Sequence, residues 1–96
     1  MPFQYGPYTF DKVRINSMVN SFGVYGLARG LILGQKPAYV GKSKFLRDRL
    51  SHWLNNPPGP GLTHFYAEAF ATEALMNARE EQLIKEFQPT LNTLLK

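Results

Sequence analysis

The stretch AYVGKSKFLRDRL, residues 38–50, changes from strand to glycine turn to basic helix within a few residues. Its first part, AYVG, is short, apolar and aromatic, which is typical of a strand. Its last part begins a predicted helix over 44–55, because four apolar side chains recur there at helical spacing. Between and within these parts lie four of the chain's eleven Lys and Arg residues: Lys42, Lys44, Arg47 and Arg49. The stretch therefore predicts a strand-to-helix turn with concentrated positive charge.

The length and composition allow one small domain and few kinds of metal site. The 96 residues, 44% of them apolar, fit a single domain over 1–96 with a modest core. The chain has no cysteine and two histidines, which excludes disulfides and argues against structural zinc. Its seven carboxylates are few for a cage, but one carboxylate with water and substrate phosphate can hold a hard divalent ion.

The charge favours an anionic partner. A net charge of +4 suits nucleic acid or a membrane surface. However, no apolar run approaches the roughly 18 residues that a membrane helix needs, and the start lacks a signal-peptide pattern. We therefore expect a soluble, intracellular, cytoplasmic protein that does not span a membrane.

The order of the remaining elements follows from apolar runs and from proline and glycine. FGVYGLA (22–28) and AYVG predict the two strands of a hairpin, and THFYAEAFA (63–71) predicts a third strand. NNPPGPG (55–61) predicts a loop, and Thr72 a helix cap. A long helix over 73–87 should end before Pro89, followed by a short C-terminal helix. The predicted order is β-β-α-β-α plus that helix, an α+β arrangement with helices packed on a small sheet.

Two segments give weaker signals. Residues 1–21 are expected to be a lead-in to a core over 22–92, irregular over 1–9 and with a short helix within 10–20. Between the hairpin strands, the apolar residues at 31–33 could extend the first strand, which leaves the turn undefined.

Glu80 stands on the apolar face of the predicted long helix. At roughly 100° per residue, four apolar side chains fall within about 60° of it: Met76, Leu83, Ile84 and Phe87. A carboxylate on a core-facing stripe needs a cation, a hydrogen-bond network or a metal as its partner. A structural ion pair with Lys or Arg of the sheet would serve as well as a metal, so both interpretations stay open.

Arg49 stands beside the apolar stripe of the predicted helix over 44–55, on a flank that it shares with Phe45 and His52. From this flank its guanidinium can reach past the edge of the core toward the sheet and bind a phosphate. The alternative is a solvated helix with an incidental basic flank.

Two tripeptides in the predicted hairpin resemble a known pair. GVY at 23–25 and YVG at 39–41 are similar to the tripeptides that name the GIY-YIG nuclease superfamily. Taken alone, Tyr25 and Tyr39 would be packing residues of strands. Their value depends on the residues that accompany them.

Three further positions extend the resemblance to about 22–92. Arg49 stands where the family places its arginine, and REEQLIKEFQPTLN (79–92) looks like the family's glutamate helix with its closing Pro-x-x-Asn. These matches include Glu80, which the helical pattern singles out independently, and Asn92. YVGKSKFLRDRL is particularly close to the branch formed by the N-terminal nuclease domain of the bacterial excision-repair endonuclease.

The resemblance implies a central three-stranded antiparallel sheet flanked by helices, and hydrolysis of DNA phosphodiester bonds with one divalent ion, Mg²⁺ or Mn²⁺. It implies that Glu80 holds the ion and that Arg49 stabilises the charge developing on the phosphate. Tyr25 would act as general base or position the attacking water. Tyr39 would hydrogen-bond within the site, and Asn92 would orient part of its network or, alternatively, be a turn or cap residue.

The basic residues of the opening stretch are expected to bind DNA. Lys42 and Lys44, with Arg47, would contact phosphates that flank the site. A solvated loop is the alternative interpretation for the two lysines.

One position departs from the family. Many relatives carry His or Tyr four residues after the arginine, where it assists proton transfer, but here that residue is Trp53, which cannot act as a base. His52, on the flank of Arg49, is a candidate substitute. The identity of the base therefore stays open.

Three hypotheses follow for the function. The first is a stand-alone endonuclease with little sequence preference, directed by DNA structure, damage or a targeting protein. The second is a nucleic-acid-binding module that is catalytically weak or inactive and acts within a larger complex. The third is an interaction role, in which GLILG (30–34) forms an exposed contact, for instance in a homodimer rather than a monomer.

Overall fold

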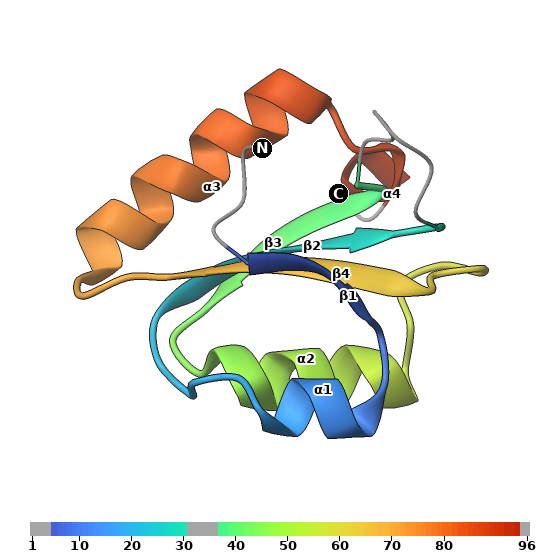
Figure 1. Ribbon diagram of the computed structural model, residues 1–96. Coiled ribbons are helices and arrows are strands. Elements are labelled where there is room, and N and C mark those ends of the chain that lie inside the picture. Colours follow the sequence, from blue (N-terminus) through green and yellow to red (C-terminus); the bar gives the residue numbers. More distant parts are fainter. Residues whose placement is uncertain (1–4, 31–36, 95–96) are drawn as a thin grey trace.

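The computed structural model describes residues 5–30 and 37–94, which form a sheet between two layers of helices. Figure 1 shows α1 and α2 against one face of the sheet and α3 against the other, with α4 at one end of α3. In chain order the elements are β1 (Tyr5–Thr9), α1 (Lys12–Asn16), β2 (Gly23–Ala28), β3 (Tyr39–Ser43), α2 (Leu46–Asn55), β4 (His64–Ala69), α3 (Glu73–Phe87) and α4 (Thr90–Leu94).

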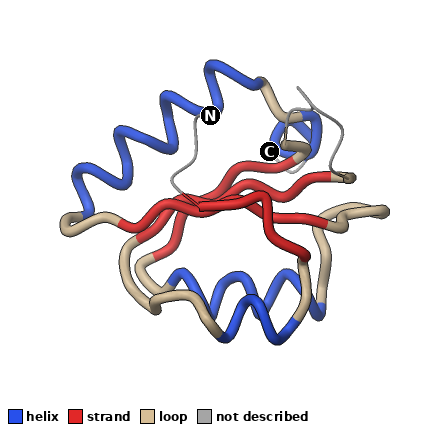
Figure 2. Tube along the Cα trace, in the orientation of Figure 1, coloured by secondary structure: helices blue, strands red, loops and turns tan. Residues whose placement is uncertain are grey.

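The sheet has four strands, which corrects the predicted three. Its order is β1-β4-β2-β3, and each neighbouring pair is antiparallel. Figure 2 shows the strands as one layer between the helices. The additional strand, β1, forms within the segment 1–9 that was predicted to be irregular. Pro7 argued against a strand in the sequence, because proline has no N–H to donate to the hydrogen-bond ladder of a sheet. Proline is nevertheless tolerated on an edge strand, and β1 is an edge strand. The pairing of β1 with β4 is also irregular between Tyr5 and Tyr8.

The other predicted elements form close to their expected places. The hairpin pairs β2 with β3, the third predicted strand is β4, and a short α1 lies within 10–20. The long helix α3 spans 73–87 as predicted, and the Thr72 hydroxyl caps it by accepting a hydrogen bond from the Leu75 N–H at 3.3 Å. The apolar residues at 31–33, and most of the GLILG contact, lie outside the described residues. Among the described helices, none is long and apolar enough to cross a membrane.

Side chains alternate along β2 and supply a separate core to each face of the sheet. Tyr25 and Leu27 pack on the side of α1 and α2, whereas Val24 and Ala28 pack on the side of α3. The first core also contains Phe10, Ile15, Met18, Leu46, Leu50, Phe65 and Ala67. The second also contains Val40, Tyr66, Met76 and Leu83.

A largely buried ion pair joins α3 to the sheet. Glu68 of β4 is 8% exposed and accepts two hydrogen bonds from Arg79 of α3, from Nε at 2.9 Å and Nη2 at 3.2 Å. This two-point geometry fixes direction as well as distance. Because Arg79 immediately precedes Glu80, the pair helps to set the rotation of α3 at the candidate site.

Replacing Glu68 by alanine is expected to destabilise the protein, because the Arg79 guanidinium would lose its carboxylate in a poorly solvated place. We expect the free energy of unfolding to fall by about 2–3 kcal/mol, measured by urea denaturation. The matched control is Glu81→Ala, which removes an exposed pair with Lys85 (3.6 Å) and should cost less than about 0.5 kcal/mol. Equal losses in the two variants would contradict the role given to Glu68.

Candidate functional site

Tyr25 is the buried centre of the candidate site. Its side chain is fully buried, and its hydroxyl accepts a hydrogen bond of 2.6 Å from the Trp53 indole N–H. The Tyr39 ring lies beside both residues, with its centroid 6.1 Å from that of Tyr25 and 5.5 Å from that of Trp53. Strands β2 and β3 and helix α2 thus bring three aromatic residues together at one edge of the sheet.

Glycine in the second tripeptide provides the space for this tyrosine. Gly41 is the register partner of Tyr25 on β3, and Ala67 is its partner on β4. A Cβ atom on Gly41 would lie only 2.6 Å from Cζ of Tyr25, closer than any ordinary contact. The ring therefore lies over the bare Cα of Gly41, and its hydroxyl is directed toward α2.

Burial raises the pKa of both tyrosine hydroxyls. Removal from water is the main cause for Tyr25, and the hydrogen bond from Trp53 and the positive charge of Arg49 offset only part of it. Burial is also the main cause of the raised pKa of Tyr39. Burial therefore favours the protonated form of both hydroxyls.

Arg49 and His52 approach the aromatic cluster from α2. Arg49 is exposed at the surface, and it lies close enough to Tyr25 and Tyr39 for its charge to lower the pKa of both. His52 is also exposed, and its ring packs edge-on against Trp53 with centroids 5.0 Å apart. His52 thus neighbours the residue that donates to the Tyr25 hydroxyl.

Glu80 approaches the same edge from α3. Its carboxylate lies 3.7 Å from the Lys42 ammonium, and Lys42 also donates a 2.8 Å hydrogen bond to the Asn77 side chain. Its negative charge is near enough to raise the pKa of Tyr39. The ion-pair interpretation of Glu80 therefore has a specific partner, Lys42 of β3. That partner does not exclude a metal, since the Glu80 side chain remains 21% exposed.

The donor set around Glu80 fits a divalent ion held by few protein ligands. No group of three or more His, Cys, Asp or Glu residues gathers among the described residues. The Glu80 carboxylate, however, faces a pocket of about 530 Å³ that has room for water. The pocket is lined by Lys42, Asn77, Glu80, Glu81, Ile84 and Lys85. Mg²⁺ is commonly bound by one or two carboxylates, several waters and a substrate phosphate, which matches this arrangement.

Asn92 binds the backbone of β3. Its Oδ1 accepts a hydrogen bond from the Val40 N–H, and its Nδ2 donates to the Val40 carbonyl, both at 2.7 Å. These backbone groups point out from the edge strand, where no further strand pairs with β3 among the described residues. Asn92 is therefore a positioning residue that holds the backbone between Tyr39 and Gly41, rather than only a turn or cap residue.

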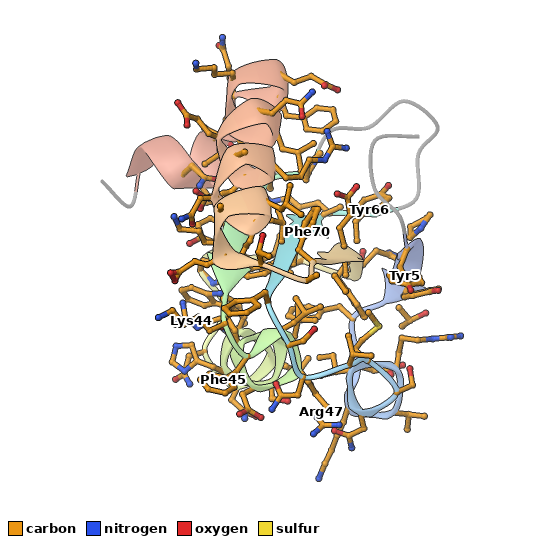
Figure 3. The ribbon with its side chains drawn as sticks, turned by 90° about the vertical axis from the view of Figure 1, so that its left-hand side faces the viewer. Tyr5, Lys44, Phe45, Arg47, Tyr66 and Phe70 are labelled. Carbon is orange, nitrogen blue, oxygen red and sulfur yellow. The ribbon has the colours of Figure 1, made fainter. Side chains whose placement is uncertain are left out.

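The other predicted DNA contacts are more dispersed than the sequence indicates. Lys44 pairs with Glu73 at 3.3 Å, and both side chains are substantially exposed. Figure 3 shows Lys44 and Phe45 at one side of the molecule and Arg47 apart from them, between α2 and α1. Arg47 thus lies on a different flank of α2 from the site, because it is two residues from Arg49 and helix neighbours recur every three or four. Phosphate contact by these residues stays a prediction.

Sequence reasoning missed the role of Trp53. Its core spacing and its lack of a basic group were recognised, but not its ability to donate a hydrogen bond to Tyr25. The side-chain chemistry could have indicated this role, because the N–H of a buried indole usually finds a hydrogen-bond acceptor.

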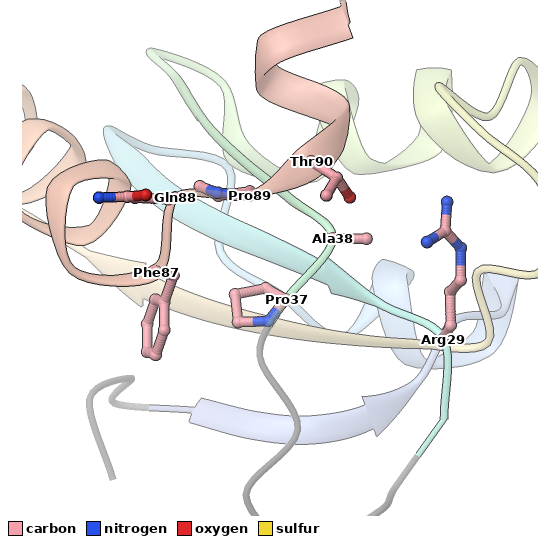
Figure 4. A pocket seen from close by; sticks show the side chains of 7 residues that line it. All are labelled: Arg29, Pro37, Ala38, Phe87, Gln88, Pro89 and Thr90. Atoms are coloured by element: carbon pink, nitrogen blue, oxygen red, sulfur yellow. The ribbon is translucent and has the colours of Figure 1, made fainter.

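A second pocket lies at the C-terminal end of α3 and is distinct from the candidate site. Its volume is about 370 Å³, and it contains none of the predicted site residues (Figure 4). It is lined by Arg29, Pro37, Ala38, Phe87, Gln88, Pro89 and Thr90.

Comparisons with known proteins identify similar structures but no similar sequence family. No protein-family model and no curated protein matches the chain. Three solved structures that match are single-substitution variants of the GIY-YIG N-terminal endonuclease domain of UvrC from Thermotoga maritima, each bound to its catalytic divalent cation. Two have TM-scores of 0.66, at 24% and 26% identity, over 82% of this chain and 90% of theirs. The third has a TM-score of 0.65 at 25% identity, over 84% of this chain and 97% of its own.

A methyl group on Gly41 is expected to displace the Tyr25 hydroxyl. Gly41→Ala should lower the free energy of unfolding by about 1–3 kcal/mol, since an overpacked core must shift. Urea denaturation of Gly41→Ala, Tyr25→Phe and the double variant measures the coupling. Because Tyr25→Phe removes the atoms in closest conflict, the double variant should lose less than the sum of the single losses. Additive losses would contradict the packing described.

Removing the Asn92 side chain should expose the Val40 backbone. In Asn92→Ala, we expect the Val40 amide to exchange with deuterium markedly faster than in the wild type, with a stability loss of about 1–2 kcal/mol. Amide exchange followed by NMR measures the first effect. The control is Asn77→Ala, which removes an exposed hydrogen bond to Lys42 and should leave Val40 protected. An unchanged Val40 in Asn92→Ala would refute the role of this side chain.

Proposed function

Since the chain folds as a GIY-YIG-like domain, as its sequence indicated, we propose that it is a divalent-metal-dependent endonuclease that hydrolyses DNA phosphodiester bonds. The observation that carries the proposal is the convergence of Tyr25, Tyr39 and Arg49 with Glu80 around the edge strand β3. Tyr39 connects these residues, because its ring centroid lies 6.1 Å from that of Tyr25 and the charges of Arg49 and Glu80 act in opposite directions on the pKa of its hydroxyl. The likeness to metal-bound endonuclease domains supports the same conclusion.

We assign the roles from the chemistry of each group. Glu80 would hold Mg²⁺ or Mn²⁺, which supplies charge neutralisation at the scissile phosphate. Arg49 would stabilise negative charge that develops on the phosphate, because its side chain is exposed beside the two tyrosines. Tyr25 would act as the general base or position the attacking water, and Tyr39 would hydrogen-bond within the site. His52 is the proposed substitute for the absent proton-transfer residue.

Lys42 would change partner as substrate binds. Its ammonium neutralises Glu80 at 3.7 Å, so a divalent ion on Glu80 would repel it. The released ammonium would then be available for a flanking phosphate, as we propose for Lys44 as well. This exchange connects the ion pair of the described structure to the DNA contact predicted from sequence.

We further propose that the enzyme acts inside the cell, where its DNA substrate lies, with little intrinsic sequence preference. DNA structure, damage or a targeting protein would direct it. The whole of 1–96 would act as one nuclease domain, as a monomer or a homodimer.

The second candidate function is DNA binding without cleavage, within a larger complex. The Lys42–Glu80 pair favours it, since the carboxylate already has a cation. Trp53 favours it too, because it replaces a proton-transfer residue. The two functions share a surface but differ in whether any divalent ion promotes cleavage.

A nicking assay on supercoiled plasmid, single-stranded DNA and branched DNA tests the proposal. We expect cleavage in Mg²⁺ or Mn²⁺, none in EDTA, and losses of at least about 100-fold in Glu80→Ala and in Arg49→Ala. Glu86→Ala is the matched control, because this exposed carboxylate of α3 does not line the pocket beside Glu80 and should leave cleavage within about two-fold.

Cleavage that depends on metal but survives both site substitutions would refute the assigned site. Salt-sensitive binding with no cleavage in any metal would instead establish the non-cutting module.

A further inference from the structure

Phe45 presents an aromatic ring to solvent beside the candidate site. It is 58% exposed, whereas Tyr5, the other exposed aromatic residue among those described, is 38% exposed and lies on β1. Leaving a phenylalanine ring in water forgoes the gain from burying it, and many other residue types could begin a helix more favourably. Phe45 is the N-cap of α2 but makes no side-chain capping hydrogen bond. The Phe45 side chain therefore contributes little to the stability of the fold.

The backbone beneath this ring is firmly held. The Ser43 hydroxyl accepts a hydrogen bond from the Phe45 N–H at 3.0 Å and donates one to the Phe45 carbonyl at 3.1 Å. The same carbonyl accepts the Arg49 N–H at 3.0 Å, and the next residue, Leu46, donates to the Ser21 carbonyl at 3.0 Å. The ring thus projects from an ordered turn, and little backbone entropy would be lost if it bound a ligand.

The surface around Phe45 carries charges of both signs, with two cations close to the ring. Phe45 lies one helical turn before Arg49 and two turns before His52, on the same flank of α2. Lys44 precedes it in the chain and lies beside it in Figure 3. The Lys44 side chain is 62% exposed and pairs with Glu73 at 3.3 Å. Helix α2 also contributes an acidic residue near Phe45, Asp48 in its first turn.

We propose that Phe45 stacks on an unpaired nucleobase adjacent to the phosphate bound by Arg49, so that the preferred substrate is single-stranded or locally unpaired DNA. Aromatic side chains next to cations are the usual way in which proteins grip single strands. Bases inside a duplex are stacked on each other and cannot offer a free face to this ring. This inference rests on the proposed function and specifies its substrate class.

Nucleic acid fits this surface better than a second copy of the chain. The core of a protein contact is depleted of charge, whereas Phe45 is flanked by Lys44 and Arg49. The residues that follow it are the buried Leu46 and then charged residues. The apolar contribution is thus a single ring among charges, which suits one base with its phosphate.

The test measures DNA binding in EDTA, where no metal-dependent cleavage occurs. Fluorescence anisotropy would compare a labelled single-stranded oligonucleotide with its blunt duplex, for the wild type, Phe45→Ala, Phe45→Leu and Phe45→Trp. We expect alanine and leucine to weaken single-strand binding about ten-fold and duplex binding less than two-fold. Leucine is the matched control for apolar bulk. The Phe45→Trp variant should retain binding. Single-stranded DNA should quench the tryptophan fluorescence of this variant more than that of the wild type.

Several outcomes would overturn the stacking proposal. They are unchanged single-strand binding in Phe45→Ala, an equal loss on duplex, full retention in Phe45→Leu, or a concentration-dependent sedimentation that Phe45→Ala abolishes. The nuclease proposal is judged separately by the Glu80-dependent cleavage described above. Selective single-strand binding through Phe45 without any cleavage would support the stacking role and refute the nuclease. Cleavage with unaltered strand preference in Phe45→Ala would do the reverse.

Discussion

The hydrogen bond from the Trp53 indole to the buried Tyr25 hydroxyl is the interaction on which the arrangement of the site depends. It can form only because Gly41 leaves the space that the end of the tyrosine ring occupies. It joins β2 to α2 through the interior, so the helix that carries Arg49 is registered against the strand that carries Tyr25. The same burial raises the pKa of Tyr25, which favours the protonated hydroxyl that accepts this hydrogen bond. The burial of Tyr25 therefore affects both the packing of α2 on the sheet and the pKa of the hydroxyl.

The edge strand β3 separates the two chemical halves of the site. Tyr39 and Gly41 face α2, whereas Lys42 on the alternate face meets Glu80 of α3. Such an arrangement requires that an edge strand, which has a free side, hold its position. Asn92 provides this restraint by binding both polar groups of the Val40 backbone. On the far side of the sheet from α2, the Glu68–Arg79 pair fixes the helix that carries Glu80.

The basic residues of the stretch 38–50 differ in their ion pairing and in their position in the structure. Lys42 and Lys44 are paired with glutamates of α3, Arg49 is exposed beside the tyrosines, and Arg47 lies on another flank. A substrate phosphate would therefore meet Arg49 directly and the lysines only by competition with carboxylates. An exposed ring at Phe45 adds a surface that can recognise a base instead of a phosphate. Under the proposed function, these features would suit DNA whose strands are accessible.

The sequence by itself determined the hairpin and the two main helices, and it singled out the residues of the candidate site. Strong periodicity and local caps decide such elements, and the spacing around Tyr25, Tyr39 and Glu80 matched a known pattern. Only the tertiary structure decided that residues 5–9 pair with β4. A strand that contains proline has a weak local signal in the sequence, and it forms here because β4 has backbone groups available for pairing. Likewise, the partners of Glu80, Asn92 and Trp53 are residues far away in the chain. Side-chain contacts of that kind arise from packing between elements, which no local pattern encodes.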